Sequence, residues 1–170
     1  MEQRESERAR TAQDNPQTDA LESARQDGRE RLRSALDRAF ERAEISKAEL
    51  LKSPEMLSGE DLGRELGLSR ATIDNRRVDG KLLALEFGSK RGFRYPRWQC
   101  ELVEERPTRE QFEAVLEHLQ SVGAWSRYRF FTQSAPALGG ETPIEALRAG
   151  AADRVLAAAN TWARGEQGGA

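Results

Sequence analysis

The chain has 170 residues, of which 33% are charged and 37% hydrophobic, and its net charge is −2. This composition is typical of a soluble protein with a modest core, and no apolar run approaches the roughly 20 residues of a transmembrane helix. One cysteine, Cys100, and one histidine, His118, can form neither an internal disulfide nor a zinc site, so no metal or other cofactor is expected. The first residues carry no export signal, which predicts a cytoplasmic protein without a membrane partner.

Residues 1–29 mix acidic and basic side chains, contain Pro16 and hold almost no large apolar residue. Such a segment cannot bury enough surface to offset its ordering entropy. We expect a disordered charged tail here, either a solvating extension or a segment that folds on a partner.

Residues 30–52 have a helical pattern, because apolar side chains recur at three- and four-residue steps from Leu32 to Ala43. Ser46 with Glu49 three residues later indicates a capping box for a further short helix, which Ser53-Pro54 ends. Two helices are therefore expected, and they either complete the core of the segment that follows or pair two subunits.

Two more short helices are predicted over residues 58–80. Ser58 and Ser69 are typical helix caps, Gly67 suits the turn between the helices, and Asp79-Gly80 ends the second one. The apolar positions of this stretch fall where a helix-turn-helix needs its small core, at Leu62, Leu66, Leu68 and Ile73.

A β-hairpin is predicted next, because apolar and aromatic runs over 82–87 and 93–98 flank a basic tip bounded by Gly88 and Gly92. Pro96 fits such a hairpin only on an edge strand or at a position without a ladder hydrogen bond. The predicted fold of residues 30–100 is a helix-turn-helix DNA-binding domain with a β-hairpin wing, in a mainly α protein.

The stretch from Ser69 to Trp98 contains eight Arg and Lys against three Asp and Glu, a local charge of +5. Arg and Asn can read base edges, whereas Ser, Thr and Lys can hold phosphates, and Asp74 either reads cytosine or orients an arginine. We expect a homodimer on palindromic double-stranded DNA. The expected DNA contacts are Ser69, Arg70, Thr72, Asp74, Asn75, Arg76, Arg77, Lys81, Lys90, Arg91 and Arg94.

Residues 101–107 form an acidic stretch that is expected to link two domains. Residues 108–165 are predicted to be a small all-helical domain, with capping boxes at Thr108 and Thr142 and a flexible end over 166–170. The aromatic side chains between Trp125 and Phe131 indicate either a core or a groove for a partner.

The stretch Leu138-Gly-Gly-x-Thr-Pro-x-Glu-x-Leu147, with Pro136 before it and Gly150 after it, resembles the toxin-binding domain of Xre/MbcA/ParS-type antitoxins. Leu82-Leu-Ala-Leu and Arg94-Tyr-Pro-Arg-Trp-Gln99 are similar to the DNA-binding half of a subset of these proteins. The resemblance covers roughly residues 46–164. Arg77 departs from it, since related helices commonly carry an apolar residue there, and residues 162–170 lack the usual apolar finish.

The resemblance implies a type II antitoxin and transcriptional autorepressor, paired with a RES-domain toxin that consumes NAD. Its helical C-terminal domain would cover the active-site cleft of the toxin. The toxin-binding residues that the resemblance implies are Trp125, Phe131, Leu138, Gly139, Gly140, Thr142, Pro143, Leu147, Trp162 and Arg164.

No enzyme is expected, because the sequence has no Gly-rich phosphate loop and no nucleophile arrangement of Ser, His and Cys. Two other hypotheses stand beside the antitoxin. One is a stand-alone transcriptional regulator or excisionase-like DNA-binding protein whose C-terminal domain dimerises. The other is an adaptor whose arginine-rich face is simply solvated and binds no DNA.

Overall fold

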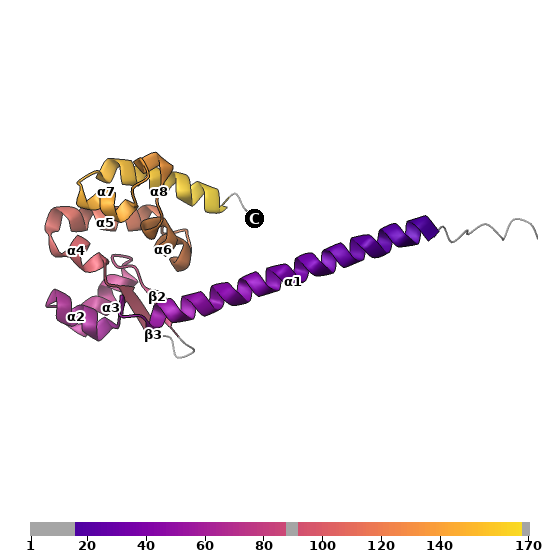
Figure 1. Cartoon of the computed structure of the whole chain (residues 1–170). Coiled ribbons are helices and arrows are strands. Elements are labelled where there is room, and N and C mark those ends of the chain that lie inside the picture. Colours follow the sequence, from indigo (N-terminus) through magenta and orange to yellow (C-terminus); the bar gives the residue numbers. More distant parts are fainter. Residues whose placement is uncertain (1–15, 88–91, 168–170) are drawn as a thin grey trace, which may run out of the picture. The chain divides into compact units, whose positions relative to one another are not determined.

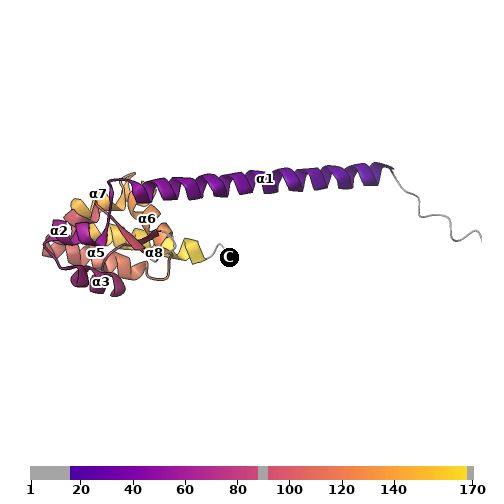
Figure 2. The ribbon, with the colours of Figure 1, turned by 90° about the horizontal axis from the view of Figure 1, so that it is seen from below.

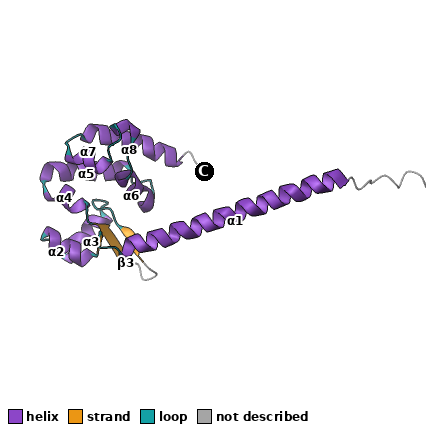
Figure 3. Cartoon of the chain, viewed as in Figure 1, coloured by secondary structure: helices purple, strands orange, loops and turns teal. Residues whose placement is uncertain are grey.

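The computed structural model describes residues 16–87 and 92–167 of the chain (Figure 1). Over these residues it contains eight α-helices, one 3₁₀ helix and one three-stranded antiparallel sheet (Figure 3). The predicted mainly helical fold is thereby confirmed. The chain divides into two compact units, Met1–Lys47 and Ala48–Ala170.

Helix α1 runs without a break over Pro16–Lys52. Residues 16–29 are therefore helical where disorder was expected, and residues 30–52 form one helix rather than two. Opposite charges one turn apart and many good helix formers favour this helix, and neither Gly nor Pro interrupts it near Ser46. It ends where expected, since the Ser53 N–H donates to the carbonyl of Leu50 at 2.9 Å.

The first part of the second unit contains a small three-stranded sheet, and helices α2 and α3 lie between its first two strands in the sequence. Strand β3 lies in the middle, and its Tyr95 pairs with Leu57 of β1 while its Phe93 pairs with Glu86 of β2. Pro96 is the last residue of this central strand, where few ladder bonds are needed. These elements are β1 (Met56–Leu57), α2 (Gly59–Leu66), α3 (Arg70–Val78), β2 (Leu85–Phe87) and β3 (Gly92–Pro96).

The rest of the unit is helical, and α5 and α8 run side by side in it (Figure 2). Residues 101–107, expected as a linker, instead belong mostly to α4 and α5, and Leu102 and Val103 are buried. Helix α5 begins at Arg106 after an N-cap without a side-chain bond, so the capping box predicted at Thr108 is not formed. The elements are α4 (Gln99–Glu104), α5 (Arg106–His118), α6 (Ala124–Thr132), the 3₁₀ helix η1 (Pro136–Leu138), α7 (Pro143–Arg148) and α8 (Ala152–Gln167).

A large core runs through this unit from α2 to α8. Leu62 of α2 and Leu147 of α7 belong to the same cluster of buried side chains. Trp98, which follows β3, packs on α5 and α6, because its ring centroid lies 6.1 Å from that of Phe112 and 5.4 Å from that of Phe131. The structure thus has no domain boundary at residues 101–107, because the apolar residues of the acidic stretch pack into the shared core.

A buried side chain fastens the segment before β2. The amide oxygen of Gln99 accepts from the Leu83 N–H at 3.0 Å, and its amide nitrogen donates to the Leu83 carbonyl at 3.0 Å. Gln99 is fully buried, so both bonds are shielded from water. The Gln99 side chain therefore satisfies the backbone N–H and carbonyl of Leu83, as a neighbouring strand would in a sheet.

Candidate nucleic-acid interface

Helices α2 and α3 are joined by a short turn that local capping fixes. The Ser58 hydroxyl accepts from the Asp61 N–H at 3.1 Å, and the Ser69 hydroxyl accepts from the Thr72 N–H at 3.1 Å. Gly67 between them has φ 65°, a left-handed conformation that favours glycine. The caps and the turn glycine predicted from the sequence are confirmed.

Gly63 allows the turn to lie against α2. The Leu68 N–H donates to the Gly63 carbonyl at 2.8 Å, and a Cβ at Gly63 would lie 2.6 Å from the Leu68 carbonyl oxygen. No side chain fits at this distance. The role of Gly63 was not predicted, although a glycine inside a helix of eight residues can signal a close backbone approach.

Helix α3 buries one face and exposes the opposite one. Ile73 is 0% exposed and belongs to the shared core, as its predicted inward position requires. On the outer side, Asn75 is exposed, and its side-chain amide makes no hydrogen bond within the described part of the chain. Its amide therefore remains available for a ligand.

Asp74 holds two arginines of α3. Its carboxylate lies 3.0 Å from Nε of Arg70 and 3.9 Å from Nε of Arg77. Arg70 also lies across the start of α2, since a Cβ at Gly59 would come within 3.0 Å of its Nε. Of the two roles predicted for Asp74, this geometry favours the orientation of arginines.

Arg77 connects α3 to the sheet. Its guanidinium carbon lies 4.0 Å from the centre of the Phe93 ring, and its side chain is 25% exposed, against 58% for Arg70. Below it, Tyr95 is fully buried, and this burial raises the pKa of the Tyr95 hydroxyl. Arg77 thus has a packing role that the sequence did not indicate, because Phe93 is distant along the chain.

The other predicted cations occupy different positions. Lys81 is exposed just after α3, and Arg76 is half-buried. Arg94 packs its guanidinium 4.5 Å from the centre of the Phe87 ring on the neighbouring strand. Lys90 and Arg91 lie outside the described residues. Ser69 and Thr72 bond to each other through their hydroxyls at 2.8 Å.

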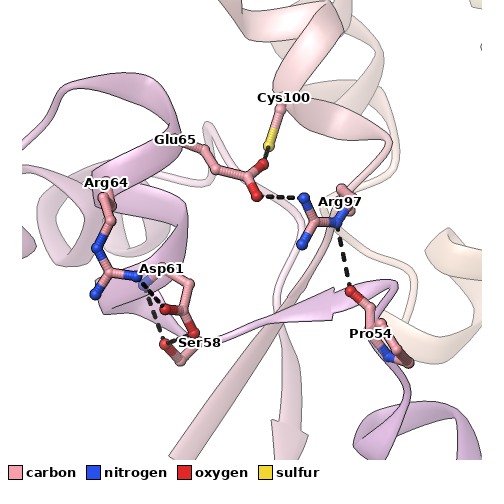
Figure 4. A network of polar contacts seen from close by, with 7 residues as sticks. All are labelled: Pro54, Ser58, Asp61, Arg64, Glu65, Arg97 and Cys100. Carbon is pink, nitrogen blue, oxygen red and sulfur yellow. Dashed lines mark hydrogen bonds and ion pairs between the residues drawn. The ribbon is translucent and has the colours of Figure 1, made fainter.

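A polar network ties α2 to the end of β3 (Figure 4). The Arg97 guanidinium binds Glu65 and also donates to the Pro54 carbonyl at 3.4 Å. Glu65 accepts from the Cys100 thiol at 3.5 Å. Burial, together with this carboxylate, raises the pKa of Cys100 to about 12, so the thiol stays protonated at neutral pH.

The same figure shows the polar end of α2. Asp61 accepts from the Ser58 hydroxyl at 2.7 Å and from Arg64 at 2.9 Å, and the first of these bonds is the main cause that lowers the pKa of Asp61. The carboxylate therefore stays charged at the N-terminus of the helix, where the helix dipole favours it.

The Leu-Gly-Gly-x-Thr-Pro stretch forms a tight turn before α7. Gly139 and Gly140 have φ of 74° and 91° and are exposed, and Thr142 forms the predicted capping box with Glu145. Four of the side chains expected to bind a toxin lie in the interior instead, at Phe131, Leu138, Pro143 and Leu147.

Trp162 and Trp125 lie in different environments. Trp162 donates from its indole N–H to the Ser126 hydroxyl at 3.1 Å and lines a groove of about 410 Å³ with Pro136, Ala137 and Phe130. Trp125 instead packs with Tyr128 against the small cluster of Leu51, Met56 and Leu85. Arg164 is exposed, and its Nε donates to the Asn160 carbonyl at 3.2 Å.

No family model, curated protein or solved structure matches this chain. Across residues 16–87 and 92–167, no group of three or more His, Cys, Asp or Glu residues could hold a metal ion. Among the same residues, none of the helices has the length and apolar character needed to cross a bilayer.

Proposed function

We propose that this protein binds double-stranded DNA through α3 and acts as an antitoxin and transcriptional autorepressor. In this proposal α2, the turn at Gly67 and α3 are a helix-turn-helix, and β2 with β3 is its wing. The observation that carries it is the exposed side of α3, where the Asn75 amide, opposite the buried Ile73, has no hydrogen bond among the described residues and Asp74 orients Arg70.

Each exposed group has a chemical task on a duplex. Asn75 can make two hydrogen bonds to adenine, and Arg70 can make two to guanine in the major groove. The free N–H groups at the start of α3, with the hydroxyls of Ser69 and Thr72, favour a phosphate. The remaining cations of the predicted site would hold the sugar-phosphate backbone, at Arg76, Lys81, Lys90, Arg91 and Arg94.

The toxin-binding part of the proposal rests on the family resemblance of residues 136–150 and on the exposed surface near them. The groove beside Trp162, the exposed turn of Gly139 and Gly140, and Arg164 supply the contact surface. Leu138 and Leu147 are buried and would contribute indirectly, because their packing in the core holds this turn and α7 in place. The partner expected is a RES-type toxin.

The shared core favours a second candidate function. Because Trp98 packs on Phe112 and Phe131, the C-terminal helices are part of the structure that carries α3. A stand-alone regulator, in which these helices support the DNA-binding surface and form a homodimer, fits that arrangement.

Selection of binding sites from randomised duplexes tests the DNA proposal. Asn75→Ala should relax the preference at one base position, at a cost of about 1 to 3 kcal/mol in discrimination. Asn160→Ala, on the exposed side of α8, is the matched control and should leave the preference unchanged. A plot of the logarithm of DNA affinity against the logarithm of salt concentration should have a slope of about −0.9 for each phosphate contacted. An affinity that does not change with salt concentration would exclude DNA binding.

Co-purification with the product of the adjacent gene tests the antitoxin proposal. Trp162→Ala should weaken the complex by about 2 kcal/mol, as expected of a central aromatic contact. Tyr128→Ala is the control, because that ring packs beside the cluster of Leu51, Met56 and Leu85 and does not line the groove. If the adjacent product binds neither variant nor the natural chain while DNA is still bound, the stand-alone regulator is the better description.

A further inference from the structure

Helix α1 carries large apolar side chains in water. Every residue from Ala24 to Ser46 is exposed. Leu32, Leu36 and Phe40 are 62%, 50% and 70% exposed. Long helices in water gain most of their stability from packing an apolar face, and within the described residues nothing covers the apolar face of this helix.

These side chains share one face. Leu32, Leu36, Ala39 and Ala43 follow at steps of four, three and four residues, and Phe40 flanks them one turn after Leu36. The alanines leave a shallow stripe between the larger residues. Such a stripe lets the backbone of a second helix approach, as ridges and grooves of packed helices require.

The stripe has one arginine on each side, and these two are called its basic shoulders. Arg33, seven residues before Phe40, lies along one side, and Arg42, seven residues after Ala35, lies along the other. Arg25 and Arg29, each seven residues before one of the two leucines, continue the line of the stripe toward the N-terminus.

The acidic residues of this helix lie mainly on the back, away from the stripe. They are Asp27, Glu30, Asp37 and Glu41, and the basic Arg31 and Arg38 also lie on the back. Glu44, at the edge of the stripe, is paired with Lys47 at 2.7 Å. Ile45, nine residues after Leu36, is 53% exposed on the back as well.

We propose that the face of α1 formed by Leu32, Leu36, Ala39, Phe40 and Ala43 docks a partner protein that presents an apolar groove or helix edged by Asp and Glu. Charge complementarity selects this occupant. Carboxylates beside the groove would meet the arginines on both shoulders of the stripe, which orients the partner as charged flanking positions do in coiled coils.

Other occupants fit this face less well. In a second copy of α1, basic shoulders would face basic shoulders in either orientation, which is unfavourable. A helix that lies on a membrane needs a large apolar face with a strongly charged opposite side, whereas this stripe is half alanine and its back is acidic. Nucleic acid would use the cations but not the apolar stripe.

Binding of two designed helical peptides to the full chain tests the proposal by fluorescence anisotropy. Both peptides carry leucine at the a and d positions of four heptads, one with Glu and the other with Lys at the flanking e and g positions. The Glu peptide should bind at least about tenfold more tightly, because only its flanks complement the arginines. Circular dichroism verifies that every variant keeps its helix.

Variants of the chain locate the contact. Leu36→Glu and Phe40→Glu should weaken binding of the Glu peptide at least about tenfold, because each puts a carboxylate into the apolar stripe. Ile45→Glu is the matched control and should leave binding unchanged, since it adds the same charge to the back. Arg33→Glu with Arg42→Glu should reduce the preference for the Glu peptide, because it removes the arginine on each side of the stripe.

Three results would overturn the proposal. They are equal binding of both peptides or of neither, a dimer in sedimentation that Leu36→Glu dissociates, and binding to phosphatidylglycerol vesicles in place of the Glu peptide. The inference stands apart from the proposed DNA function, because Leu36→Glu should leave DNA affinity unchanged. A chain that binds the peptide but no DNA would refute only the latter.

Discussion

The α2–α3 region and the turn before α7 use the same local devices for different ends. In each, a hydroxyl caps a helix, at Ser69 and at Thr142, and a left-handed glycine precedes it, at Gly67 and at Gly139. Around α3, most of the predicted site residues remain on the surface, whereas around α7 four of them are buried. Leu138, the first residue of the C-terminal motif, is 1% exposed.

This difference shows that helix caps and turn glycines predict local structure only. Candidate binding groups are instead the exposed polar side chains that make no hydrogen bond within the fold. Asn75 is such a group, since no hydrogen bond within the described residues occupies its amide. Thr142 is not, because its hydroxyl and its N–H are both bonded to Glu145. The two regions can be compared by substitutions.

Trp98→Ala should have the largest effect, because this ring follows β3 and packs on α5 and α6. Trp98 is partly buried against the shared core, and its loss should cost about 3 kcal/mol, the low end for a large aromatic side chain. Both regions should lose stability together, with one transition in denaturant whether followed by fluorescence or by hydrogen exchange. Two separate transitions would show that the regions fold independently. Phe40→Ala, on the exposed face of α1, is the control and should change stability little.

Gly63→Ala should destabilise α2 and α3 by about 2 kcal/mol, as overpacking does. The added Cβ would meet the Leu68 carbonyl oxygen at 2.6 Å, and that oxygen belongs to the backbone and cannot simply turn aside. Gly123→Ala, where nothing lies within 4 Å of the added Cβ, should be nearly neutral. Equal midpoints in urea for the two variants would contradict the close approach.

Ser69→Ala and Thr142→Ala should each cost about 1 kcal/mol, as the loss of a helix cap does. Their effects on DNA affinity should differ, because only Ser69 lies at the proposed phosphate site. Thermal unfolding and DNA titration of both variants measure the two quantities separately. An equal loss of DNA affinity in both would remove the distinction between the regions.

The smallest effect expected is a change in the stability of the fold at acidic pH, caused by Glu145. Bonds from the Thr142 backbone and hydroxyl lower the pKa of Glu145 below the ordinary value, so this carboxylate stabilises the fold above about pH 4.3, the value of an unfolded Glu. That contribution is lost as pH falls through the lower folded pKa. The stability advantage over Glu145→Gln should hold at pH 7 and disappear in strong acid, as unfolding titrations at several pH values would show.

Sequence patterns predicted the short-range features well. The caps at Ser58, Ser69 and Thr142, the turn at Gly67 and the inward position of Ile73 depend on residues a few positions apart, and all are confirmed. The mainly helical class follows from the same periodicities.

Features that depend on distant residues were not predictable. Strand β1 has two residues and exists only because Met56 and Leu57 pair with β3. Arg77 reads as a surface cation until Phe93 is brought beneath it. The acidic stretch 101–107 reads as a linker because its two apolar residues, Leu102 and Val103, reveal their burial only in the folded core.

The two hydrogen bonds between Gln99 and Leu83 have a mechanical consequence. They clamp the chain entering β2 to the first residue of α4, and β3 leads into the same helix through Arg97 and Trp98. The two strands are therefore attached to α4 at both ends that lead away from the tip. A displacement of β2 and β3 by a ligand would also displace α4 and the Trp98 ring, which packs on the C-terminal helices.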